Sequence, residues 1–198
     1  NALTSPTLQD DQVWRNKAIT IMLRGLDPIP CLVKDRYGYV MAVNRSWVVY
    51  ARYWLGDFID DLPLNINRLF FHDQGWQQYA EGLSEVGRQG MACLKQELLL
   101  QHDDRADQLY KDMLEYTWFK TQLRENHPWV PPMNVFNLRL QRHQERQTST
   151  VIITTFTEEP IVEPRLLIET WFPRDFTSPI TAAEMLSDTS IQHSLLPY

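Results

Sequence analysis

The sequence lacks a long uninterrupted run of apolar residues. No stretch of the 198 residues approaches the roughly 18 consecutive apolar positions that a membrane-spanning helix needs. A secretory signal has a short basic segment followed by an apolar run, and the sequence has no such segment. We therefore expect neither a membrane span nor a signal peptide.

Cysteine is scarce, with two in the chain, Cys31 and Cys93. Cys31 falls in an expected strand and Cys93 in an expected helix. Neither has a second metal-ligating residue at the short spacing of a metal site. Buried free thiols in a reducing cytoplasm are the favoured interpretation, and a disulfide is the alternative.

An excess of positive charge is also missing. Lysine and arginine number 19 against 25 acidic residues, which gives a formal charge of −6 and a pI near 5.3. The basic cluster most suited to nucleic acid consists of Arg139, Arg142, His143 and Arg146. These residues fall at an expected strand end and hairpin loop, where basic side chains more often form a solvated face. We do not expect this chain to bind DNA by itself.

Motifs for catalysis and metal binding are absent from the sequence. There is no nucleophile elbow and no glycine-rich phosphate loop. The histidines do not follow the short ligand spacings of a metal site; they are His72, His102, His127, His143 and His193. We expect no metal, no cofactor and no enzymatic activity.

Large aromatic side chains, in contrast, are plentiful. Seven Trp, eight Tyr and eight Phe are more than a minimal core of this size requires. The chain is long enough for about one domain. The surplus leaves room for an apolar cavity or for an interface.

The rest of the chain is organised around residues 31–55. Two short strand-like stretches are joined by a turn in which Asp35 can bond the backbone and Gly38 tolerates positive φ. The period then changes to that of a helix over 47–55, and Asn44 or Ser46 occupies the N-cap position.

Apolar stripes at helical spacing predict further helices on both sides of this stretch. They cover 11–26, 76–98 with Asp73 as its cap, 104–114 and 117–126. A loop over 56–64 and a short apolar element over 65–73 lie between them.

The C-terminal part shows strand periodicity. Strands are predicted over 135–140, 151–156 and 166–172, with 141–148 as a polar connection. Two strands, a block of helices and three more strands indicate an α+β domain with a five-stranded antiparallel sheet. We expect the first two strands to lie beside the last three, and the helices to cover one face.

The order Asp35-x-x-Gly38-x-Val40-x-x-x-Asn44 resembles the opening of PAS domains, and the chain from 29 to 160 resembles the MmyB-like ligand-binding domain of bacterial transcription regulators. The matching segments are Pro30-Cys31-Leu32-Val33, Asn65 with Arg68 and Phe71, Leu94-Lys95, Tyr116-Thr117-Trp118-Phe119 with Leu123, and Thr157-Glu158-Glu159-Pro160. The aromatic segment departs from the family pattern at three signature residues.

This resemblance implies a PAS-like sheet with an apolar pocket for a small hydrophobic ligand, with a fatty acid as the best candidate. It also implies a homodimer and an XRE-type helix-turn-helix domain that is missing from these residues. The chain lacks an initiator methionine and starts with Asn1-Ala2, as after tag cleavage, so we expect a piece of a longer protein. The expected division is 1–10 tag remnant and linker, 11–27 connector helix, 28–172 ligand-binding domain and 173–198 C-terminal extension.

Candidate ligand-binding residues are apolar and aromatic positions of the predicted strands and helices, together with two polar ones. They are Leu32, Met41, Val43, Trp47, Tyr50, Arg68, Leu69, Phe70, Tyr79, Met91, Leu94, Met113, Phe119, Phe136, Leu138, Ile152 and Phe156. Arg68, Tyr79 or His127 would meet a ligand carboxylate. Simple core packing is the alternative for each apolar position. A protein-interaction module without ligand, and an intracellular enzyme, are the alternatives for the domain.

Overall fold

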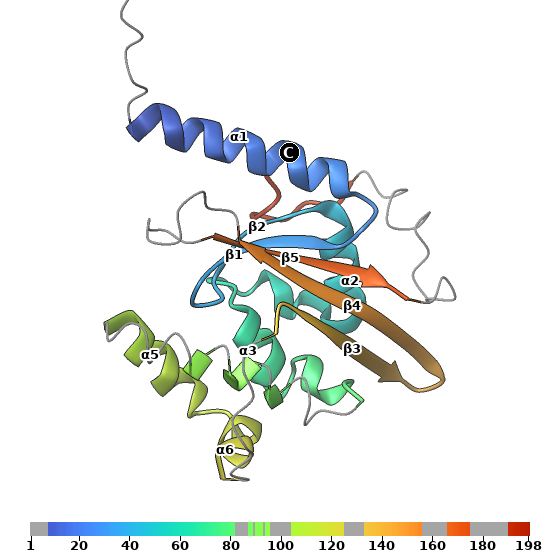
Figure 1. Cartoon of the computed structure of the whole chain (residues 1–198). Coiled ribbons are helices and arrows are strands. Elements are labelled where there is room, and N and C mark those ends of the chain that lie inside the picture. The colour runs from blue at the N-terminus through green and yellow to red at the C-terminus, as the bar shows by residue number, and fades with distance from the viewer. Residues whose placement is uncertain are drawn as a thin grey trace, which may run out of the picture.

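A computed structural model describes residues 8–81, 87–88, 90–92, 94–95, 104–124, 133–155, 166–174 and 190–198, with side chains from residue 16 onward. Its centre is a five-stranded antiparallel sheet in the order β2-β1-β5-β4-β3 (Figure 1). The strands are β1 (Cys31–Asp35), β2 (Val40–Val43), β3 (Val135–Arg142), β4 (Glu145–Thr155) and β5 (Leu166–Pro173). The predicted placement of the first pair beside the last three, and with it the α+β PAS-like fold, is confirmed.

The turn between β1 and β2 forms as predicted. Asp35 Oδ1 accepts hydrogen bonds from the backbone N–H groups of Tyr37 at 3.0 Å and Tyr39 at 2.9 Å. Gly38 has φ of 86°, and a Cβ there would come within 2.7 Å of Asn67 Nδ2. Glycine is therefore required both by the backbone conformation and by the close approach of the Asn65–Asn67 segment.

Asn44 is the N-cap of helix α2 (Arg45–Leu55), which settles the choice between the two predicted caps. Its Oδ1 accepts from Trp47 N and from Cys31 N, both at 2.9 Å, while Nδ2 donates to Ile29 O at 2.8 Å. One buried amide thus starts the helix and ties it to β1. Ser46 instead donates its hydroxyl to Asp27 Oδ1 at 2.6 Å.

Helix α1 (Leu8–Leu26) corrects the expectation that the helices cover one face of the sheet. Its residues Ile19 and Leu23 pack with Cys31 and Val33 of β1 and Ile168 of β5. In Figure 1, α1 lies on one side of the sheet and α3 on the other. Both faces of β1 are apolar in its first three residues, so each face needs a cover.

The opposite face is covered by α2 and by several short elements. These are η1 (Gly56–Asp60), α3 (Ile66–Phe71), η2 (Trp76–Gln78), α5 (Asp104–Met113) and α6 (Thr117–Arg124). Asn65 caps α3 through its side-chain oxygen, which accepts from Asn67 N at 2.9 Å. The predicted short element and the two predicted helices after residue 104 are therefore present.

The predicted helix over 76–98 is wrong at its start. Trp76 to Gln78 form a single 3₁₀ turn, and Ala80 then makes a β-bridge with Leu140. Gln141 N donates to Tyr79 O at 2.7 Å, and Glu81 N donates to Arg139 O at 2.9 Å. This segment covers the open edge of β3, which outweighs its helical periodicity. Residues 87–88, 90–92 and 94–95 are helical.

The polar connection predicted over 141–148 is also wrong. β3 and β4 continue to Arg142 and Glu145, and the chain reverses at His143, whose φ is 57°. Residues 143–146 at the tip of the hairpin are exposed, and Arg146 there pairs with Glu81 at 2.9 Å, whereas Gln147 is buried. A two-residue turn joins these long strands.

The C-terminal residues return to the start of the domain. Leu195 O accepts from Val43 N of the edge strand β2 at 3.0 Å, and the Tyr198 hydroxyl donates to Asp27 Oδ2 at 2.7 Å. Ile191 and Leu196 pack against the core on the α2 side. This segment therefore supports both β2 and the junction between α1 and β1.

The sulfur of Cys31 is a free thiol buried between β1 and α1. Burial raises its pKa to about 12, against a weaker opposing hydrogen bond from Thr170. The buried free thiol predicted at Cys31 is confirmed, whereas Cys93 lies outside the described residues. Within the part of the chain that is described, no helix is long and apolar enough to cross a bilayer.

Replacing Asn44 with alanine tests the link between α2 and β1. Asn44→Ala removes an N-cap and leaves the buried N–H of Cys31 unpaired, so the free energy of unfolding should fall by about 2–4 kcal/mol. Urea unfolding followed by circular dichroism measures this change. Asn16→Ala, on the exposed side of α1, is the control and should change it by less than about 0.5 kcal/mol. Equal stability of the two variants would contradict the role of Asn44.

Candidate functional site

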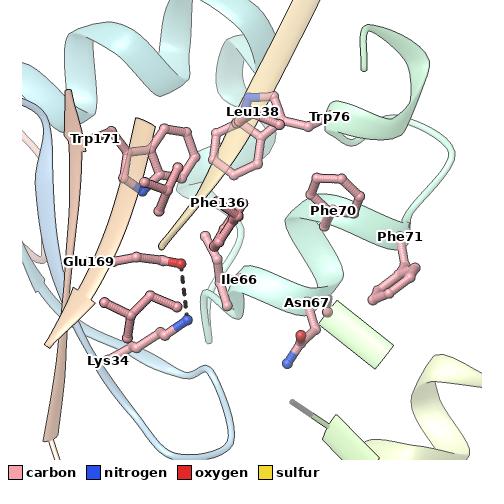
Figure 2. A pocket seen from close by; sticks show the side chains of 13 residues that line it. Lys34, Ile66, Asn67, Phe70, Phe71, Trp76, Phe136, Leu138, Glu169 and Trp171 are labelled. Carbon is pink, nitrogen blue, oxygen red and sulfur yellow. Dashed lines mark hydrogen bonds and ion pairs between the residues drawn. The ribbon is translucent and has the colours of Figure 1, made fainter. Parts of the chain in front are cut away.

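A cavity of about 70 Å³ lies between α3 and the face of the sheet opposite α1 (Figure 2). Most of its lining is apolar or aromatic. The lining residues are Lys34, Ile66, Asn67, Phe70, Phe71, Trp76, Gly90, Phe136, Leu138, Val151, Ile153, Glu169 and Trp171. A concave apolar site with a small number of polar groups is the usual form of a small-molecule site.

The two-residue period of the strands determines which side chains reach the cavity. Phe136 and Leu138 of β3 face it, as do Val151 and Ile153 of β4 and Glu169 and Trp171 of β5. Phe136 lies opposite Val151, and Val151 lies opposite Trp171. These three side chains therefore form one row across β3, β4 and β5. The helix α3 supplies the opposite wall.

The polar floor of the cavity is an ion pair between two central strands. Lys34 Nζ of β1 lies 3.2 Å from Glu169 Oε1 of β5, and their side chains are 11% and 4% exposed. The register pairs Lys34 with Leu167 and Leu32 with Glu169, so the two charged residues are diagonal neighbours. Figure 2 shows both side chains reaching from their strands to the same point.

The second oxygen of this carboxylate is unusual. Glu169 Oε2 is buried and has no hydrogen-bond partner in the part of the chain that the structure describes. A buried polar atom left without a partner costs about 1–3 kcal/mol, and more when it is charged. The cavity therefore contains an unused acceptor at the end formed by the sheet.

Beside the cavity, the space beneath α2 is filled by the protein's own aromatic side chains. Trp76 packs on Trp171 with ring centroids 4.8 Å apart and on Trp47 at 6.3 Å, while Tyr50 meets Trp171 at 5.4 Å. These rings are buried. Burial also raises the pKa of Tyr50, which keeps its hydroxyl protonated.

The predicted lining residues fall in several places. Phe70, Phe136 and Leu138 line the cavity. Those near α2 are packed in the core, namely Leu32, Val43, Trp47, Tyr50 and Leu69. Those beyond α3 belong to a second apolar cluster that includes Phe71, namely Met91, Leu94, Met113 and Phe119.

The remaining predicted residues lie away from the cavity or outside the described part. Met41 is 56% exposed on β2, and Ile152 points to the sheet face opposite Val151 and Ile153. Arg68 pairs with Asp61, and Tyr79 packs against Trp54 with ring centroids 5.5 Å apart. Phe156 and His127 are not among the described residues.

The sequence analysis missed the charged pair at the floor of the cavity. A signal was present, because Lys34 interrupts the apolar run Cys31-Leu32-Val33 and Glu169 interrupts Leu166-Leu167-Ile168. A charge inside a strand that is otherwise apolar usually needs a buried partner. Pairing the two would have required the register between β1 and β5.

Metal-ligating side chains do not cluster in the described part of the chain. Among the described residues, no group of three or more His, Cys, Asp or Glu side chains could hold a metal ion. Besides apolar contact, the cavity offers the Lys34–Glu169 pair at its end and the buried indole N–H groups of Trp76 and Trp171, which have no hydrogen-bond partner within the described residues.

Comparison with known proteins identifies the family of the chain, and the chain also aligns with a solved structure. The family model described as the MmyB-like transcription regulator ligand binding domain matches residues 16–180. No curated protein sequence matches the chain. Among solved structures, the crystal structure of the PAS domain of an HTR-like protein from Haloarcula marismortui aligns over 82% of this chain and 98% of that chain, with 12% identity and a TM-score of 0.34.

Removing one member of the ion pair should be far more harmful than removing both. Lys34→Met leaves the buried Glu169 without its counter-charge, so the free energy of unfolding should fall by about 3–5 kcal/mol. The double variant Lys34→Met with Glu169→Met should recover most of this loss, because apolar side chains of similar volume replace a buried pair at little net cost. Urea unfolding of both variants measures the difference.

The exposed pair of Arg146 and Glu81 supplies the control. Arg146 is 71% exposed, and Arg146→Met should change the free energy of unfolding by less than about 1 kcal/mol. A single Lys34→Met variant as stable as the double variant would show that the pair is not buried as described.

Proposed function

The chain belongs to the family of MmyB-like transcription regulator ligand binding domains, and on this premise we propose that it senses a small hydrophobic ligand for a bacterial helix-turn-helix regulator. The family is one of regulator ligand-binding domains and not of enzymes. In this proposal the DNA-binding domain lies outside these residues, and the complete regulator works in the cytoplasm. Contact with DNA belongs to that domain, in keeping with the net charge of −6 of this chain.

The cavity between α3 and the sheet carries this proposal. Its lining is almost entirely apolar, with the Lys34–Glu169 pair at one end, which suits a molecule with an apolar body and one polar group. Each methylene that leaves water on entering it contributes about 0.8 kcal/mol. A fatty acid or a similar amphipathic molecule is the ligand that we propose.

The size of the cavity bears on how such a ligand is accommodated. About 70 Å³ is well below the roughly 300–1,000 Å³ of typical ligand sites. A chain of several methylenes fits only if one wall moves outward. We propose that α3 is this wall, since it is six residues long and supplies Ile66, Asn67, Phe70 and Phe71 to the lining.

Displacement of α3 would be transmitted through β1 to α1. Ile66 N donates to Gly38 O at 2.8 Å, so α3 is bonded to the turn that follows β1. Lys34 of β1 lines the cavity, while its neighbour Val33 packs on the other face against α1. One strand thus contacts both the ligand site and the helix that we propose as the connector to the DNA-binding domain.

A homodimer is the assembly that we propose for the regulator. Val135 and Phe172 lie on the sheet face that α1 covers elsewhere, and they are 53% and 36% exposed. Packing of a second copy there would bury these apolar side chains. The same face would serve a protein-interaction module without ligand, so ligand binding has to be tested directly.

Native mass spectrometry after gentle purification, followed by solvent extraction, tests for a bound ligand. We expect a small amphipathic molecule to be recovered with the protein. A panel of short fatty acids and alcohols should also raise the melting temperature in a concentration-dependent manner. Repeated recovery of empty protein, with no shift from any member of the panel, would contradict the proposal.

Filling the cavity from β4 should abolish binding. Ile153 lines the cavity and Ile152, its neighbour, faces the other side of the sheet. In Ile153→Phe the ring occupies the cavity, so the affinity for 1-octanol, a short chain with one polar end, should fall at least about tenfold. Titration calorimetry measures this affinity.

Ile152→Phe is the matched control for this substitution. It adds the same ring one residue away on the opposite face, and the affinity for 1-octanol should stay within about twofold of the wild-type value. Equal losses in the two variants, with both folded by circular dichroism, would place the ligand somewhere other than this cavity.

A further inference from the structure

The polar end of the cavity restricts the head group of the ligand more than its apolar walls do. Lys34 and Glu169 are the charged members of the described lining, and as whole residues they are 8% and 3% exposed. Lys34 Nζ makes one hydrogen bond, to Glu169 Oε1, and Glu169 Oε2 makes none within the described residues. Free donors and a free acceptor therefore lie side by side.

A charged head group would meet an unfavourable neighbour at this end, whatever its sign. A carboxylate that approaches Lys34 also approaches Glu169, because the paired atoms are 3.2 Å apart. An ammonium group that approaches Glu169 meets Lys34 in the same way. In a buried site such like-charge contacts are weakly screened, and the charge loses its hydration as well.

A neutral group with one donor and one acceptor avoids both penalties. Its O–H or N–H donates to Glu169 Oε2, and its oxygen accepts from a free proton of Lys34 Nζ. It also removes the cost of the unpartnered carboxylate oxygen. Hydroxyl, primary amide and protonated carboxylic acid groups have this arrangement.

Building on the proposed function, we infer that the ligand binds with a neutral hydrogen-bonding head group held between Lys34 and Glu169. A fatty acid would satisfy this condition only in its protonated form. The apolar walls set the chain that fits, and the pair selects against the charged forms of the head group.

Four probes with the same chain and different head groups test this inference. At neutral pH, 1-octanol and octanamide are neutral, octanoate is an anion and octylamine is a cation. Titration calorimetry with the wild-type chain should give dissociation constants for the two neutral probes at least about tenfold below those of both charged probes.

Glu169→Gln should reverse part of this order. The variant leaves Lys34 without a counter-charge in the cavity, so octanoate should gain at least about tenfold relative to 1-octanol, and octylamine should weaken further. Glu81→Gln makes the same substitution in the exposed pair with Arg146, and the order of the four probes should remain that of the wild type.

The outcomes separate this inference from the proposed function. Binding of octanoate or octylamine as tightly as 1-octanol, or an order that Glu169→Gln leaves unchanged, overturns the neutral head group while the ligand-binding role stands. Failure of all four probes to bind overturns the ligand-binding cavity and the inference with it.

A second variant covers the case in which Glu169→Gln does not fold. Lys34→Met with Glu169→Met removes both charges and keeps the apolar walls. Its affinities for 1-octanol and octanamide should lose their hydrogen-bond contribution and fall at least about fivefold. Unchanged affinities would show that the pair does not contact the head group and would overturn the inference.

Discussion

The burial of β1 on both faces is the constraint on which the domain depends. All five of its residues are buried, and it pairs with β2 on one edge and β5 on the other. Cys31 and Val33 pack under α1, whereas Leu32 joins the aromatic core and Lys34 reaches the cavity. Successive residues of β1 point to opposite faces of the sheet. A displacement of a residue on one face therefore acts directly on its neighbour in the chain, which packs on the other face.

The floor of the cavity shows how this constraint produces a specific site. Lys34 is largely buried in a central strand, and Glu169 of the neighbouring strand compensates its charge at 3.2 Å. The same geometry leaves Glu169 Oε2 unpartnered beside apolar walls. The pair of residues that the sheet requires is therefore also the pair that we propose as the recognition element for a ligand.

The aromatic surplus serves packing more than it enlarges the cavity. Trp47, Trp76 and Trp171 interlock beneath α2 and occupy the middle of the sheet. The open space lies beside α3, a helix of six residues. Asn65 caps its N-terminus, and its first residue, Ile66, donates a backbone hydrogen bond to Gly38. This six-residue helix is the wall whose displacement we propose.

The sequence by itself determined the features that depend on neighbours along the chain. The Asp35–Gly38 turn, helix α2 and the strand β5 follow from residue types and periods within a few positions, whereas the choice of Asn44 over Ser46 as the cap of α2 came from the structure. The placement of the first two strands beside the last three also followed, together with Phe70, Phe136 and Leu138 as candidate lining residues. The placement of α1 on the far face, the strand pairing of Ala80, and the choice of Ile153 over Ile152 were decided by the tertiary structure. So was the pairing of Lys34 with Glu169, because it depends on the register between strands that are 135 residues apart in the chain. Local periodicity shows that a side chain is buried, but only the packed structure shows which face it enters and whether that space is already filled.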